Sequence, residues 1–87
     1  MKITLDGAKM TSRAAAHEHI AAEMAFPEWY GKNLDALWDM LAASGEMEIE
    51  LINAPAMLNG MDSYACRMLS VFYEADKENE NVSFRVV

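Results

Sequence analysis

Hydrophobic and polar residues alternate in three short segments, and between these segments the apolar residues recur every three or four positions. The alternating segments are residues 2–5, 47–52 and 82–87. Alternation predicts β-strands, and the turn signal Asp6-Gly7 ends the first of them. One face of each strand is polar, so one face of the predicted sheet would be exposed and the helices would lie mainly on the other. The polar residues are Thr4, Glu48, Glu50, Ser83 and Arg85.

Two helices are predicted between the first and second strands. Thr11 or Ser12 can cap the first, which runs to about Ala25 before Pro27 breaks the chain. Its buried stripe has steps of four residues: Ala16, Ile20 and Met24. The second helix begins after Asn33 and ends near Ser44, with Gly45 expected in the C′ position.

Two further helices are predicted between the second and third strands. A short helix has Pro55 in its first turn and stops at Asn59-Gly60, and a longer one extends to about Lys77. The polar residues ahead of them would be their caps: Asn53 for the first, and Asp62 or Ser63 for the second. The longer helix would bury one apolar face: Ala65, Met68, Leu69 and Phe72.

The resulting order, β-α-α-β-α-α-β, predicts an α/β fold. Long helical crossovers join parallel strands, so we expect a three-stranded parallel sheet packed by about four helices. At 87 residues, 53% hydrophobic and 24% charged, the chain suits one folded domain over residues 1–87.

The net charge and the cysteine content limit the classes of function that the chain can have. Seven basic and fourteen acidic residues give a net charge of −7, which argues against direct nucleic-acid binding. This charge indicates either a cationic partner or only solubility. One cysteine excludes an internal disulfide framework. Without an apolar run of about 18 residues or a signal sequence, the expected location is the cytoplasm, away from membranes.

The helix after Asn33 carries the most informative charges. Asp35 and Asp39 are four residues apart, and like charges at this spacing repel by roughly 0.2–0.5 kcal/mol. No basic residue of the same helix lies three or four positions from Asp39. Either a cation outside the chain uses both carboxylates, or this is an ordinary solvated face. The apolar stripe of the helix would face the core: Leu34, Leu37, Trp38 and Leu41.

Two aromatic residues precede this helix. Trp29 and Tyr30 lie between Pro27 and Gly31, and large aromatic side chains in a constrained loop are typical anchors for a partner. The alternative is that one or both rings cover the edge of the core. Glu74 could add a carboxylate to the same surface if the last helix lies alongside.

The run Pro-Glu-Trp-Tyr-Gly-Lys-Asn-Leu-Asp-Ala-Leu-Trp-Asp at residues 27–39 closely resembles the signature of the barstar family, intracellular inhibitors of barnase-type ribonucleases. Residues 5–7 and 69–75 are similar to other parts of the family pattern. The resemblance implies an inhibitor of a guanyl-specific, barnase-like extracellular ribonuclease or of a related toxin nuclease. The second helix and its preceding loop would plug the active site of that nuclease. The acidic surface would then mimic RNA phosphate, and the aromatic loop would mimic a base.

The resemblance also implies individual roles. Asp39 would enter the substrate phosphate site, Asp35 and Glu74 would share one arginine of the nuclease, and Trp29 would pack over its catalytic histidine. We predict one partner-binding set from the resemblance and the aromatic loop together: Trp29, Tyr30, Gly31, Asn33, Leu34, Asp35, Trp38, Asp39, Val71 and Glu74.

Three residues depart from the family pattern. Trp29 replaces a tyrosine, Lys32 an acidic residue and Ser44 a tryptophan. They indicate a nuclease other than barnase, or reduced affinity for barnase. The alternative function is an interaction module whose partner is not a ribonuclease.

The remaining candidate chemistry is weak. His17 and His19 diverge by about 200° around a helix, so they cannot share a metal ion. Cys66 is expected to be a small buried residue. We therefore predict a protein that is not an enzyme, has no metal or cofactor, and binds one basic nuclease as a monomer.

Overall fold

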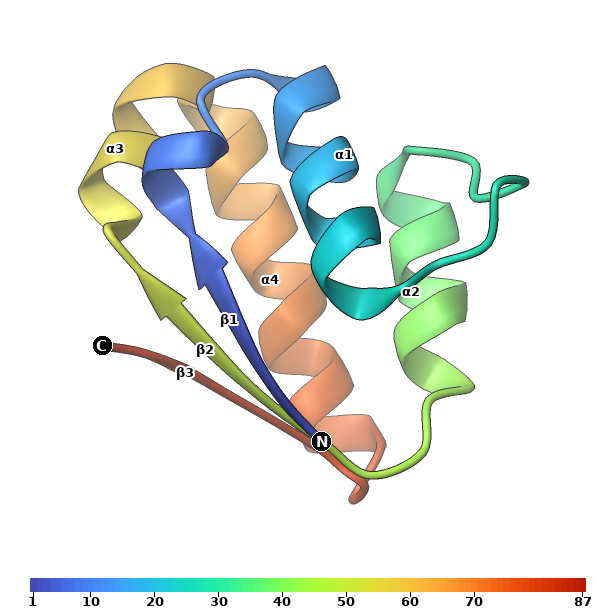
Figure 1. Cartoon of the computed structure of the whole chain (residues 1–87). Coiled ribbons are helices and arrows are strands. Elements are labelled where there is room, and N and C mark those ends of the chain that lie inside the picture. The colour runs from blue at the N-terminus through green and yellow to red at the C-terminus, as the bar shows by residue number, and fades with distance from the viewer.

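The computed structural model describes all 87 residues and has the predicted order of elements (Figure 1). Three strands form one parallel sheet in the order β1-β2-β3: β1 (Lys2–Asp6), β2 (Met47–Ile52) and β3 (Val82–Val86). Four α-helices connect them: α1 (Arg13–Met24), α2 (Leu34–Ala42), α3 (Ala54–Met61) and α4 (Ser63–Glu78). A short 3-10 helix that was not predicted, η1 (Gly7–Lys9), follows β1. The predicted α/β fold is confirmed.

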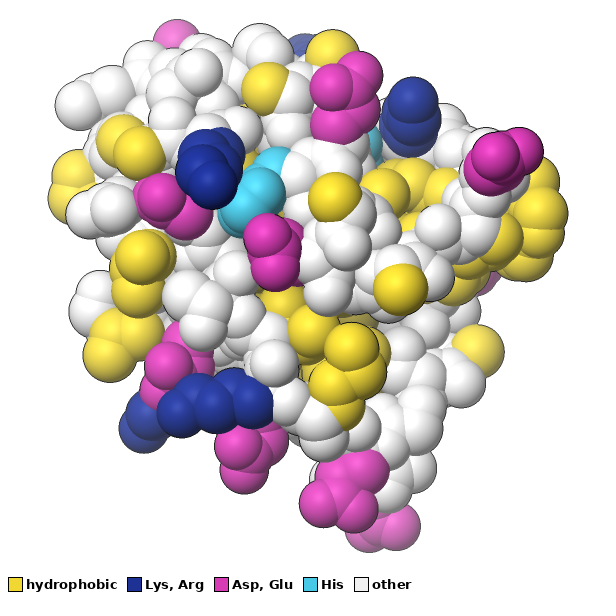
Figure 2. Space-filling model, viewed as in Figure 1, with side chains coloured by type: hydrophobic (Ala, Val, Ile, Leu, Met, Phe, Trp, Pro, Cys, Tyr) yellow, Lys and Arg dark blue, Asp and Glu magenta, His cyan; other side chains and the backbone are white.

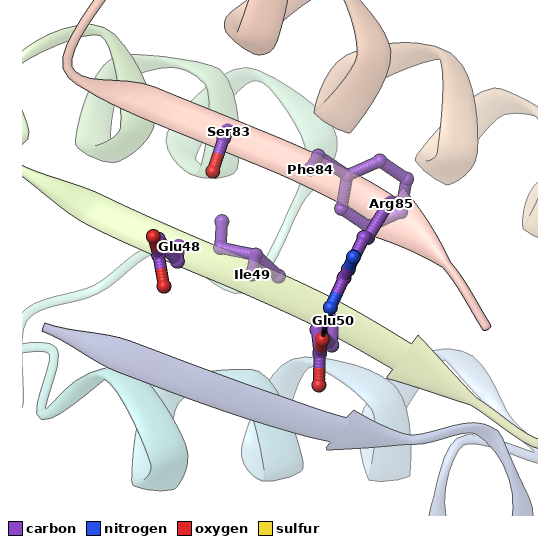
Figure 3. A pocket seen from close by; sticks show the side chains of 6 residues that line it. All are labelled: Glu48, Ile49, Glu50, Ser83, Phe84 and Arg85. Carbon is purple, nitrogen blue, oxygen red and sulfur yellow. Dashed lines mark hydrogen bonds and ion pairs between the residues drawn. The ribbon is translucent and has the colours of Figure 1, made fainter.

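The helices cover one face of the sheet, as Figure 1 shows with the strands nearly edge-on. The other face is polar, as predicted, and Glu50 lies at its centre between Lys2 and Arg85. Figure 3 shows Arg85 reaching from β3 to Glu50 on β2, and its Nε atom donates to Oε2 at 2.9 Å. This hydrogen bond is the main reason that the pKa of Glu50 is lowered.

A single apolar core fills the space between the sheet and the helices. The predicted stripe of α1 is confirmed, because Ala16, Ile20 and Met24 are all buried. Burying one large aliphatic side chain contributes roughly 1.5–3 kcal/mol, so these faces fix the helices on the sheet. Leu69, predicted to be inward, is only partly buried at the edge of this core.

The predicted caps of α1 and α2 are confirmed. The Ser12 hydroxyl accepts a hydrogen bond from the Ala15 N–H, and the Asn33 side-chain oxygen accepts one from the Ala36 N–H at 2.7 Å. The caps predicted for α3 and α4 are wrong. Asn53 and Asp62 occupy the N-cap positions, but they have positive φ angles and neither side chain caps its helix.

The predicted role of Gly45 at the end of α2 is also wrong. The helix ends at Ala42, and no glycine has a positive φ angle. Instead, the Asn79 amide, from beyond α4, donates to the carbonyl oxygens of Leu41 and Ser44, each at 3.1 Å. A side chain distant in sequence therefore satisfies the free carbonyls that a local glycine turn was expected to satisfy.

Helix α3 continues through Asn59-Gly60 to Met61, where a break was predicted. Gly60 is needed there for close packing, because a Cβ atom would lie 2.6 Å from the Thr11 Cα atom. No helix of the chain has both the length and the apolar character that crossing a membrane requires.

Strand β3 is an outer strand of the sheet, and its free edge is partly closed. The Phe84 N–H donates to the Asp76 Oδ2 atom of α4 at 2.8 Å. Phe84 also stacks on Phe72 of the same helix, with ring centroids 4.9 Å apart. These contacts fix β3 against α4.

Candidate functional site

The loop between α1 and α2 projects from the helical layer (Figure 1). It begins at Ala25, which adopts the left-handed conformation that ends α1, and it closes at Asn33, the cap of α2. Trp29 lies in this loop with 77% of its surface exposed. Figure 2 shows hydrophobic side chains gathered at the projecting end of the molecule, with acidic and basic groups nearby. An exposed tryptophan on a short, constrained loop is a candidate anchor for another protein.

Tyr30 has the opposite orientation and is only 5% exposed. Its hydroxyl is 2.8 Å from the His17 Nδ1 atom, and the Tyr64 hydroxyl is 2.7 Å from Nε2 of the same ring. Of the two alternatives for these rings, the structure therefore supports burial at the core for Tyr30, which is not a surface contact, and exposure for Trp29. The hydrogen bond of Tyr30 and its packing against Phe26 hold it in the core.

Burial shapes the electrostatics of this internal network. Desolvation raises the pKa of Tyr30, with a further contribution from Tyr64, and it lowers the pKa of His17. A neutral imidazole has one donor and one acceptor nitrogen, so it can serve both hydroxyl groups. The network therefore ties the loop to α1 and to the start of α4.

Asp35 and Asp39 are both exposed on α2. Neither forms an ion pair, because the only ion pairs of the chain are those of Glu50. Asp39 shares a hollow of about 380 Å³ with Trp29 and Gly31. A carboxylate and an aromatic ring thus line the same depression, in which a cationic or planar group could be held.

Helix α4 lies beside α2 and extends this surface. A second hollow, of about 440 Å³, lies between the two helices and is lined by Asp35 and Trp38 on one side and by Val71 and Glu74 on the other. The sequence could not establish this juxtaposition, which adds Glu74 to the carboxylates of α2. We call the surface formed by Trp29, Gly31, Asp35, Asp39 and Glu74 the acidic face.

Nine of the ten predicted residues are exposed or partly buried, and Tyr30 is the exception. Leu34 and Trp38, expected in the buried stripe of α2, are only partly buried because they line the hollow beside α4. Ser70, which four-residue spacing places on the same side of the helix as Glu74, also lines this hollow. Sequence patterns missed the buried link at His17 and one further acidic residue of the hollow, Glu78, which lies four residues after Glu74.

The other residues considered for chemistry, His19 and Cys66, lie outside the acidic face. The His19 Nε2 atom accepts a hydrogen bond from the Asp6 N–H at 3.0 Å. Cys66 is exposed on α4, which corrects the prediction that it is buried. The chain contains no group of three or more histidine, cysteine or acidic residues arranged to hold a metal ion.

The whole chain matches a known family. The family model described as Barstar (barnase inhibitor) matches residues 1–87. A protein of Bacillus subtilis (strain 168) named "Putative ribonuclease inhibitor YrdF" is 32% identical over 88 residues, which cover 99% of this chain and 96% of that protein. Both matches include the loop, α2 and α4, the elements that carry the acidic face.

Proposed function

The chain belongs to the barstar family, and from this premise we propose that it inhibits a barnase-like ribonuclease, or a related toxin nuclease, by covering the active site with its acidic face. Members of this family are inhibitors and not enzymes, and their partners are ribonucleases. We also propose that the nuclease is guanyl-specific, that the predicted partner-binding residues form the contact, and that one inhibitor binds one nuclease.

One observation carries the proposal. Asp35, Asp39 and Glu74 come from two helices, are all exposed and have no cationic partner within the chain. A nuclease that binds RNA needs cationic groups for phosphate, and charge-assisted hydrogen bonds to carboxylates are among the strongest polar contacts. The acidic face therefore supplies the charge that such an active site attracts.

Each charged or aromatic residue of the acidic face has a proposed task. Asp39 takes the place of a substrate phosphate, while Asp35 and Glu74 approach one arginine from either side of their shared hollow. Trp29 packs on the catalytic histidine of the nuclease. Tyr30 supports the loop from inside through His17.

The other predicted contacts are neutral and surround these groups. Leu34, Trp38 and Val71 line the α2–α4 hollow, and Gly31 and Asn33 form the end of the loop. Neutral groups at the rim exclude water from the central charged contacts. One acidic face predicts one nuclease per inhibitor and a free inhibitor that is monomeric. The cytoplasmic location is part of the same proposal and rests on the resemblance to intracellular inhibitors.

The test is an inhibition titration against barnase at low and physiological salt, using the wild type and the Asp39→Ala variant. We expect stoichiometric inhibition by the wild type, strong loss in the variant, and slower association at higher salt. Glu80→Ala, which removes an exposed carboxylate from the α4–β3 turn, is the matched control.

Equal inhibition by the wild type and by Asp39→Ala would overturn the mechanism. Absence of inhibition at either salt would indicate another partner, as the departures at Trp29, Lys32 and Ser44 allow. A pull-down that recovers only a partner without nuclease activity would then favour the interaction-module alternative.

A further inference from the structure

Three basic side chains meet beside the acidic face. Arg13 at the start of α1, Lys32 in the loop and Arg67 on α4 line one hollow of about 430 Å³. Asn33, Leu34 and Asp35 also line this hollow, so it adjoins the start of α2. The chain has only seven basic residues against fourteen acidic ones, and three of the seven gather here. We call this hollow the cationic hollow.

Tyr64 holds two of these cations in place. The Arg13 guanidinium lies 4.3 Å from the centroid of its ring, and that of Arg67 lies 5.2 Å away. The Tyr64 side chain is itself fixed, because the residue is only 7% exposed and its hydroxyl bonds to His17. Two guanidinium groups on one rigid ring form a pre-organised cationic site, so little side-chain entropy remains to be lost on binding.

No carboxylate of the chain forms an ion pair with these cations. The only ion pairs are those of Glu50 on the far side of the sheet, and Asp35, which lines the same hollow, pairs with none of the three. Like charges held together without a counter-ion repel, and a chain rich in acidic residues could have paired them. This arrangement is favourable when an anionic group of a partner completes it.

We propose that the cationic hollow binds carboxylate side chains of the partner nuclease and thereby determines which nuclease is inhibited. This inference rests on the proposed function and deepens it. The partner would have a surface of mixed sign, with a cationic active site opposite Asp39 and acidic residues next to it opposite Arg13, Lys32 and Arg67. A nuclease that is basic at both places is disfavoured, because like charges across an interface cost affinity.

The first experiment uses barnase as the probe and compares two double variants. Lys32→Gln/Arg67→Gln neutralises the hollow, and Lys2→Gln/Lys9→Gln removes two exposed basic residues of β1 and η1. Both change the net charge from −7 to −9, that is −7 − 2. For the hollow variant we expect about fivefold tighter inhibition at low salt, with the gain lost at high salt. The control should change less than twofold.

The second experiment tests the preference for carboxylates directly. Single Lys→Glu and Arg→Glu variants of barnase, all outside its active site, are titrated with the wild-type inhibitor and with Lys32→Gln/Arg67→Gln. We expect at least one barnase variant to be inhibited about fivefold more tightly by the wild type, and this gain should vanish with the double variant. Such a double-mutant cycle isolates the contact from the general effect of charge.

The outcomes separate this inference from the proposed function. If the wild type inhibits barnase and both double variants behave alike, the hollow lies outside the interface and only this inference fails. If the wild type does not inhibit but the hollow variant does, both the inference and the inhibitor function are supported. If no form inhibits any barnase variant, both fail together. Thermal melting of each variant excludes unfolding as the cause.

Discussion

The two sides of the molecule use charge in opposite ways. On the open face of the sheet, Glu50 is paired with both Lys2 and Arg85, so its charge is compensated within the chain. On the helical side, the carboxylates of Asp35 and Asp39 have no such partner. Exposed ion pairs add little stability, yet they show which charges the fold already satisfies.

This difference distinguishes a surface that supports the fold from one that is available to a partner. Unpaired carboxylates on a rigid helix cost some stability through repulsion, as with Asp35 and Asp39 at four-residue spacing. That cost is small beside what a desolvated ion pair contributes in a complex. The comparison can be tested by changing one group on each side.

The largest effect is expected from Asp39→Asn. The variant keeps the shape of the side chain and removes its charge, so inhibition of the nuclease should weaken by about 2–5 kcal/mol. Folding stability should be unchanged or slightly higher, because the repulsion with Asp35 is relieved. Inhibition titrations and urea unfolding measure the two quantities. A parallel loss of both would show that Asp39 serves the fold.

A smaller loss is expected from Trp29→Ala. Exposed aromatic anchors typically contribute on the order of 2 kcal/mol to binding, and Trp29 is 77% exposed in the free chain. Its removal should leave the melting temperature unchanged while the dissociation rate of the complex increases. Trp29→Tyr should restore most of the affinity, and failure of this rescue would argue against a role for the aromatic ring.

Next in size is His17→Gln, which should lower the free energy of unfolding by about 1–2 kcal/mol, because buried tyrosine hydroxyls lose a partner. Burial lowers the pKa of His17 in the folded state, so below about pH 6.5 the unfolded chain binds a proton first. Wild-type stability should therefore fall as the pH decreases below this value, until it passes the folded-state pKa.

The test of this pH dependence is urea unfolding of the wild type and of His17→Gln between pH 5 and pH 7.5. The variant lacks the titrating group, so the difference between the two proteins should shrink as the pH falls. Only Tyr30 and Tyr64 meet the imidazole through hydrogen bonds, and the two guanidinium groups on the Tyr64 ring further oppose a positive charge there. A constant difference across this range would contradict the assignment.

The smallest effect is expected from Glu50→Gln on the open sheet face. Its carboxylate bonds to Arg85 at the surface, so the melting temperature should fall by only a few degrees. Acid titration should also change, because the lowered pKa of Glu50 stabilises the fold above its unfolded pKa, and this contribution is lost as the pH falls through the folded value. Inhibition should be unaffected, and any loss would show that the sheet face contributes to binding.

Local patterns predicted the fold well. Alternation at Met47–Ile52 and the caps at Ser12 and Asn33 depend on neighbours in sequence, and the structure confirms them. The errors occur where a distant segment decides. Asn79 replaces Gly45 at the end of α2, and the Thr11 backbone requires the glycine within α3.

The candidate site divides in the same way. Asp35 and Asp39 could be found from helix spacing alone, whereas their proximity to Glu74 depends on how α2 packs against α4. Tyr30 and His17 are thirteen positions apart along the chain, and no periodic pattern links them. Chain spacing therefore identified the charged groups but not the buried hydrogen bonds that support the loop.

The Asp76 carboxylate at the free edge of β3 affects the tendency of the sheet to aggregate. An open strand edge is a template on which further chains can pair and aggregate. Asp76 accepts the hydrogen bond of the Phe84 N–H, so this donor is not available to another strand. The carboxylate also repels the carbonyl oxygens of any strand that would pair there. Asp76 therefore partly closes this side of the sheet to the addition of further strands.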